Sequence, residues 1–255
     1  MPIAGSAWHD YVTRFHRERP AITEALLAHT RRGDVGSPYD WLVRGVTHAE
    51  NATWVDLGCG SAPIHPRQRA ARYVGVDVSA AELAVAASVG RSALVRATAT
   101  GLPLAAETAD VVSAAMSLML LDPTARAMAE IARVAKPGAV LAVIVPTGWP
   151  VAVRDARGLL TMTTALRDIP SAGGVVELRL PRLMRAAGFD VLDNRALRFS
   201  YRLADEHDVR LLIESLHLPN VSTRRMDAAV TALARRAGPG ADFPVPIRRL
   251  LARRR

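Results

Sequence analysis

A short apolar run that ends in two glycines, at residues 53–60, restricts most strongly how this chain can fold. Thr53 to Leu57 has the pattern of a buried parallel strand, and Gly58 and Gly60 follow it directly. Glycines between a strand and a helix let a ligand approach the backbone, because side chains there would collide with it. We therefore expect a ligand at this turn.

A second run of the same kind, at residues 73–78, ends near Asp77, 17 residues after Gly60. A carboxylate at the end of the neighbouring strand is well placed to accept hydrogen bonds from both hydroxyls of a ribose. The dinucleotide fingerprint needs a third glycine where this chain has Pro63, so NAD is not predicted. Two other roles stay open, with Asp77 capping the next helix and Asp56 bracing the loop.

Strands then alternate with helices, which predicts a parallel sheet with right-handed crossovers. We expect strands at 93–96, 109–115, 139–145, 189–201 and 243–251, and helices at 80–89, 123–135, 205–217 and 223–237. Two short helices are expected within 8–29, a loop over 31–39 and a further helical stripe from 41 to 46.

Four segments then show a resemblance. They are Val55-Asp56-Leu57-Gly58-Cys59-Gly60, Val74-Gly75-Val76-Asp77-Val78-Ser79, Leu102-Pro103-Leu104 with Ala109-Asp110-Val111-Val112, and Glu130-Ile131-Ala132-Arg133-Val134-Ala135-Lys136-Pro137-Gly138. In order and spacing they resemble successive motifs of class I S-adenosylmethionine-dependent methyltransferases, over about residues 50–148. The resemblance implies an α/β fold with a Rossmann-like, seven-stranded, mostly parallel sheet whose last strand is reversed. It also implies S-adenosylmethionine as the cofactor.

The resemblance carries the cofactor-binding role to Asp56, Gly58, Cys59, Gly60, Asp77, Val78, Thr98, Ala99 and Ser117. Gly58 and Gly60 would lie under the methionine part, Asp77 on the ribose, Thr98 and Ala99 beside adenine, and Ser117 facing the reacting centre. The chain departs from the family at Thr98, where an acidic residue usually binds the adenine amino group, and at Ala62, which replaces the third loop glycine. Pro63 and Pro66 are expected to shorten the first helix.

The flanking segments predict a cover over this core. Residues 1–50 are expected to form an N-terminal helical cap on a core of 51–255, with a helical insertion at about 205–237 before the last strand. Small-molecule methyltransferases of this class have such covers, so we expect a metabolite as the methyl acceptor. His9, His16 and His217 lie on the proposed cover, but none is assigned as the base, and Trp8, Tyr11, Phe15 and Trp41 are expected to serve packing.

The net positive charge of the chain keeps RNA open as an alternative methyl acceptor. The chain has 33 basic and 24 acidic residues, and residues 151–255 carry nineteen and eleven of them. The arginines among the last eight residues are expected to be solvated or to point out of a sheet edge. Lys136 is the only lysine, which excludes the Lys-Asp-Lys-Glu arrangement of ribose 2′-O-methyltransferases. A noncatalytic protein that keeps the fold is a third possibility, prompted by Thr98.

The single cysteine, Cys59, excludes an intramolecular disulfide and a cysteine-based zinc site, and no metal site is predicted. We expect a cytosolic protein, since no export signal or membrane-spanning run is found in the sequence.

Overall fold

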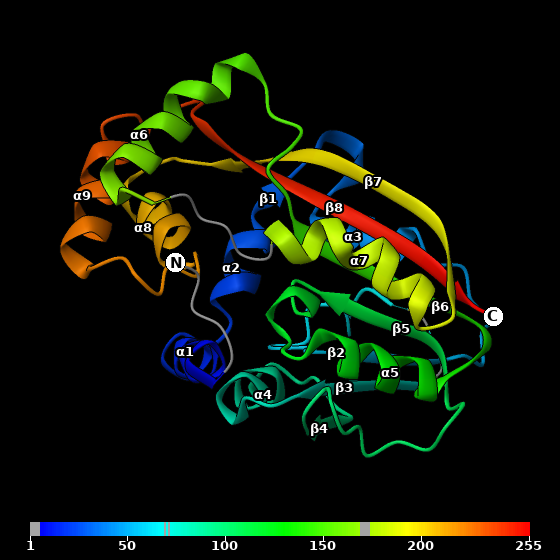
Figure 1. Cartoon of the computed structure of the whole chain (residues 1–255). Helices are drawn as coiled ribbons and strands as arrows, with labels where there is room; N and C mark the ends of the chain where they lie inside the picture. The colour runs from blue at the N-terminus through cyan, green and yellow to red at the C-terminus, as the bar shows by residue number, and fades with distance from the viewer. Residues whose placement is uncertain (1–5, 69, 71, 169–173) are drawn as a thin grey trace.

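An eight-stranded sheet forms the centre of the computed structural model, which describes residues 6–68, 70, 72–168 and 174–255 (Figure 1). The strand order is β1-β7-β8-β6-β5-β2-β3-β4. The strands are β1 (Thr30–Arg31), β2 (Thr53–Leu57), β3 (Arg72–Asp77), β4 (Leu94–Arg96), β5 (Ala109–Ala115), β6 (Ala135–Pro146), β7 (Phe189–Arg202) and β8 (Asp242–Arg254).

The sheet confirms the Rossmann-like arrangement with a reversed last strand. Strands β2 to β6 pair in parallel, and β8 runs antiparallel to both of its neighbours, β6 and β7. The eighth strand is β1, which pairs antiparallel with β7 at the sheet edge. The expected loop over 31–39 is therefore wrong in part, because it contains the end of β1, a 3-10 helix at Gly33–Val35 and the start of α3.

Helices cover both faces of the sheet. They are α1 (Ser6–Glu18), α2 (Ile22–Ala28), α3 (Pro38–Arg44), α4 (Ala80–Ser88), α5 (Thr124–Val134), α6 (Ala156–Leu166), α7 (Gly174–Ala186), α8 (Glu206–Glu214) and α9 (Thr223–Ala234). Alternate strand residues enter separate cores, so Trp54 belongs to the core that includes residues of α2, α3, α8 and α9, whereas Val55 belongs to the core that includes residues of α5 and α7. Figure 1 shows α1, α2, α6, α8 and α9 gathered at one end of the sheet.

The observed helices differ from the predicted ones at two places. The segment between β2 and β3 contains only turns among its described residues, where a shortened helix was expected. Pro63 and Pro66 lack the amide hydrogens that a helix needs, and Ala62 has a left-handed φ of 57°. Helix α6 was not predicted at all, since its Gly158 and three threonines are weak helix formers.

The C-terminal arginines divide between fold and solvent: Arg253 and Arg255 are exposed as expected, whereas Arg249 is buried and the expected sheet edge is wrong. Strand β8 lies between β6 and β7. Arg249 is buried, pairs with Asp193 at 2.7 Å and donates to the Trp41 carbonyl at 2.6 Å. Its guanidinium also lies 4.6 Å from the centre of the Trp41 ring, and Arg254 donates to the Gly188 carbonyl. None of the described helices is long and apolar enough to span a membrane.

The substitution Arg249→Ala should lower the free energy of unfolding by about 3 kcal/mol, because it removes a buried guanidinium that hydrogen-bonds to Asp193 and to the Trp41 carbonyl. Arg253→Ala, at an exposed position of the same strand, should change it by less than about 0.5 kcal/mol. Urea unfolding of the two variants measures the difference. Equal effects would show that Arg249 contributes no more than a surface arginine.

Candidate functional site

A cavity of about 220 Å³ lies where the carboxyl ends of β2, β3, β4 and β5 meet. The segments that follow these strands line its floor, and residues of α1, α2 and α3 line its cover. Carboxyl ends of parallel strands at a switch point are the usual ligand site of an open α/β sheet, because the loops there diverge and leave a crevice. The cavity is therefore the candidate functional site.

Two glycines shape the floor after β2. Gly58 has a φ of 62°, and a Cβ there would lie 2.4 Å from the Ser117 Cβ. Ser117 in turn donates its hydroxyl to the Leu57 carbonyl at 2.7 Å, which joins the ends of β2 and β5. Gly60 has a φ of 54°, and a Cβ on it would approach nothing closer than 3.5 Å. The bare backbone at Gly60 thus forms a cradle that a side chain would fill.

Asp77 ties this turn to the next strand. Its two carboxylate oxygens accept the backbone N–H groups of Gly60 and Ser79, both at 2.8 Å. Burial raises the pKa of Asp77, and these two hydrogen bonds oppose the rise. Each oxygen keeps a second lone pair, so the carboxylate can still accept from a ligand in the cavity.

Asp56 does not line the cavity, whereas the other eight predicted cofactor residues do. It is buried beneath the turn and accepts hydrogen bonds from Ser113 Oγ at 2.6 Å and Tyr73 Oη at 2.9 Å. Trp54 Nε1 donates to the same Ser113 oxygen. Burial raises the pKa of Asp56 to about 6, against the lowering effect of the two hydroxyls. Its position fits the bracing role left open by the sequence.

The wall of the cavity formed by Val78 and residues 98–100 combines an apolar surface with hydroxyl groups. Val78 is exposed over 40% of its surface, which is unusual for valine after a central strand. Thr98 Oγ1 lies 3.2 Å from Thr100 Oγ1, and both residues line the cavity with Ala99. This side therefore offers an apolar contact and two hydroxyl groups, and no carboxylate among residues 97–100.

The backbone is strained at Met116, directly after β5. Met116 lines the cavity and has a φ of 62°, and its backbone N–H donates to the Ile144 carbonyl at 2.9 Å. A non-glycine residue in the left-handed region costs about 1 kcal/mol or more, and such residues gather at functional sites. Ser117 follows at once, so the strained turn sets where its side chain enters the cavity.

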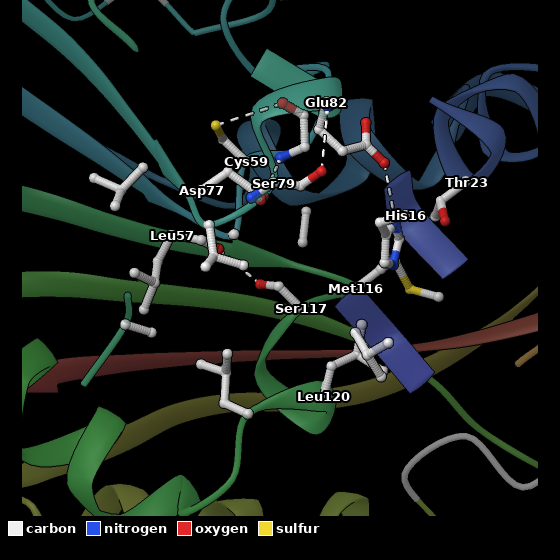
Figure 2. Close-up of a pocket in the computed structure, with 18 of the residues that line it drawn as sticks. His16, Thr23, Leu57, Cys59, Asp77, Ser79, Glu82, Met116, Ser117 and Leu120 are labelled. Atoms are coloured by element: carbon white, nitrogen blue, oxygen red, sulfur yellow. Dashed lines mark hydrogen bonds and ion pairs between the residues drawn. The ribbon is translucent and has the colours of Figure 1, made fainter. Parts of the chain in front are cut away.

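A carboxylate and an imidazole join the floor to the cover (Figure 2). Glu82 is 3% exposed, and its Oε1 lies 2.9 Å from His16 Nδ1. Its Oε2 accepts the backbone N–H of Ala21, also at 2.9 Å. Ser79 caps α4 through the Glu82 amide, so the Ser-x-x-Glu spacing resembles a capping box, but the carboxylate of Glu82 reaches α1 and α2 instead.

The three histidines proposed on the cover separate in the structure. His9 and His16 line the cavity, and His217 does not. His217 Nε2 lies 3.3 Å from His16 Nε2, and its ring centre is 4.4 Å from that of Phe15. Burial, with a smaller effect of His16, lowers the pKa of His217 to about 3, which keeps this ring neutral. Trp8 and Tyr11 also contact His217, in agreement with a packing role.

Several cavity residues were missed by sequence reasoning. They are Thr23, Glu24, Tyr39, Glu82 and Met116. Glu24 illustrates why, since Arg91 donates to both of its oxygens, at 2.7 and 2.9 Å, from 67 positions away. A pattern within one segment holds no signal for such a pair. The position of Glu82 on the α4 turn that follows Asp77 was the one local clue.

Comparison with known proteins agrees with this geometry. Residues 55–143 match the family model described as "Methyltransferase domain". No curated protein matches the sequence.

Solved structures share the fold over nearly the whole chain. The [4+2]-cyclase SpnF is 20% identical, with a TM-score of 0.61, over 100% of this chain and 98% of that one. Geranyl diphosphate C-methyltransferase from Streptomyces coelicolor A3(2), in complex with Mg²⁺, geranyl-S-thiolodiphosphate and S-adenosyl-L-homocysteine, is 15% identical, with a TM-score of 0.56 over 100% of both chains. A geranyl diphosphate methyltransferase with sinefungin is 14% identical, with a TM-score of 0.55 over 98% of this chain and 100% of that one.

Asp56 predicts a pH dependence of stability. Its pKa of about 6 lies above the ordinary 3.8, so the stability that protonated Asp56 contributes is full below about pH 4 and is lost as the pH rises through 6. The loss should reach roughly 3 kcal/mol by pH 7. Asp56→Asn, which does not titrate, should remove this part of the slope. Urea unfolding of both proteins between pH 4 and 7.5 tests this, and parallel curves would contradict it.

Proposed function

We propose that the protein is a class I S-adenosylmethionine-dependent methyltransferase that methylates a small, uncharged metabolite, a proposal supported by the match of residues 55–143 to a methyltransferase domain. One observation carries the proposal. The described residues that line the covered cavity include no arginine or lysine, in a chain of formal charge +9. A site for phosphates or nucleic acid concentrates such residues instead.

The residues at the carboxyl ends of the strands fit the cofactor. The bare backbone of Gly60 supplies a cradle, and the carboxylate of Asp77 has lone pairs for the ribose hydroxyls. Val78, Thr98 and Ala99 would hold adenine through the apolar side of the cavity. When bound, S-adenosylmethionine supplies an electrophilic methyl group on a sulfonium sulfur.

The chain itself contributes to methyl transfer mainly by positioning the reactants and by excluding water from the site. Ser117 and Met116 are fixed by the Leu57 and Ile144 carbonyls, so the wall beside the reacting groups is rigid. Helices α1 and α2 close over it through the two contacts of Glu82. Alignment of two reactants in such an enclosed site accounts for most of the rate gain in methyl transfer.

An RNA acceptor is less well supported. The arginine excess of the last third includes residues used by the sheet, such as Arg249 with Asp193 and Arg198 with Asp155 and Asp242. The diphosphate substrate named for two of the structural neighbours also has no cationic match among the described cavity residues. We also propose a cytosolic location, which the single, buried cysteine supports.

Asp77→Ala should weaken binding of S-adenosylhomocysteine by on the order of 2 to 4 kcal/mol, because it removes two hydrogen bonds to the ribose. Asp34→Ala, at an exposed carboxylate that does not line the cavity, should leave binding unchanged. Isothermal titration calorimetry of both variants, with circular dichroism to check the fold, gives the comparison. Unchanged affinity in Asp77→Ala would remove Asp77 from the site.

Methyl-labelled S-adenosylmethionine distinguishes the acceptor classes. We expect label transfer and S-adenosylhomocysteine formation with uncharged metabolites, and little change in rate between low and high salt. Transfer to structured RNA that falls steeply with salt would overturn the metabolite assignment. Conversion of a substrate without S-adenosylhomocysteine formation would indicate a reaction like that named for the cyclase neighbour.

A further inference from the structure

The contact between Glu82 and His16 borders the cavity, and the roles given above assign no ligand to it. Both residues line the cavity, and their side chains are only 4% and 18% exposed. A buried carboxylate costs free energy unless its hydrogen bonds are made, so its retention at a cavity wall points to a ligand-facing role.

The position of the pair along the cavity identifies the part of the ligand that it faces. Figure 2 shows His16, Thr23 and Met116 together at one side, with Asp77 and Leu57 toward the other. A Cβ on Gly60 would lie 3.5 Å from Glu82 Oε2, so this carboxylate overlooks the glycine cradle. A cofactor whose ribose lies on Asp77 and whose adenine lies on Val78 would extend its remaining end toward Glu82 and His16.

That remaining end of S-adenosylmethionine is an amino acid, which carries one ammonium and one carboxylate group. Oε1 of Glu82 contacts His16 Nδ1 and Oε2 accepts from Ala21 N, and each oxygen keeps a lone pair for an ammonium N–H. His16 Nδ1 faces Glu82, and His16 Nε2 lies 3.3 Å from His217 Nε2, so both ring nitrogens have partners and the ring holds Glu82 in place.

We propose that Glu82 binds the α-ammonium group of the cofactor's methionine part, with His16 as the residue that positions the Glu82 carboxylate. This inference rests on the proposed use of S-adenosylmethionine and adds the residues that recognise its amino-acid end. His16 of the cover helix α1 and the amide of Ala21 hold the Glu82 carboxylate beside the glycine cradle, so the cover takes part in this recognition.

Two probes separate this role from a purely structural one. S-adenosylhomocysteine contains the amino-acid end, and 5′-methylthioadenosine has the same adenosine and sulfur without it. A change that only loosens α1 weakens both ligands, whereas loss of a contact to the amino-acid end weakens S-adenosylhomocysteine alone. The ratio of the two dissociation constants is the quantity to measure, by isothermal titration calorimetry on the full chain.

Wild-type protein should bind S-adenosylhomocysteine at least tenfold more tightly than 5′-methylthioadenosine. Glu82→Gln and His16→Gln should each reduce that ratio about tenfold and change 5′-methylthioadenosine binding less than twofold. His9→Gln, on the same helix and also at the cavity, should leave the ratio unchanged. Asp77→Asn should weaken both ligands by similar factors, because both carry the ribose.

Three results would overturn the inference. They are equal affinities of the two ligands for wild-type protein, equal losses for both ligands in Glu82→Gln and His16→Gln, and an unchanged ratio in these variants. If wild-type protein bound neither ligand, the proposed function would fail as well. Binding of S-adenosylhomocysteine with an unaltered ratio would leave that function intact and show that Glu82 does not contact the amino-acid end.

Discussion

The carboxylate of Asp77 is the constraint on which the rest of the site depends. By accepting the N–H groups of Gly60 and Ser79, it fixes the glycine turn after β2 against the start of α4. These two segments belong to separate crossovers, and the same carboxylate keeps lone pairs directed at the cavity. One side chain therefore shapes the floor and also lines the cavity. Its raised pKa reflects the burial that this position requires.

Asp56 is a second buried carboxylate, and it lies beneath the turn that Asp77 fixes. Asp56 accepts from Ser113 and Tyr73, and thereby joins β2 to β5 and β3 under the turn. No buried side-chain oxygen or nitrogen lacks a partner among the described residues. A satisfied polar network of this kind specifies one arrangement of its strands, because any shift leaves a buried group unpaired. The elevated pKa of Asp56 shows that this support is obtained against a desolvation cost.

The cover completes the site with residues from distant parts of the chain. Glu82 on α4 contacts His16 on α1 and the amide of Ala21 before α2, while His217 approaches His16 from beyond α8. Among the described residues, the N-terminal cap lines the cavity, whereas the inserted helices predicted at about 205–237 contribute no lining residue and contact the cap through His217. Their division into separate domains stays a prediction, since contacts such as Arg249 with Trp41 join cap and core closely.

Local patterns predicted much of the fold, because buried strands and turn glycines leave their signal within a few residues. By itself the sequence determined the strands around Val55 and Val76, the glycine turn and the carboxylate at Asp77, since each follows from apolar runs or backbone freedom. Tertiary structure alone decided that Asp56 lies beneath the cavity, that β8 is interior and that Glu82 faces His16 across 66 positions. Those outcomes depend on which distant surfaces pack together, and no single segment encodes its partner.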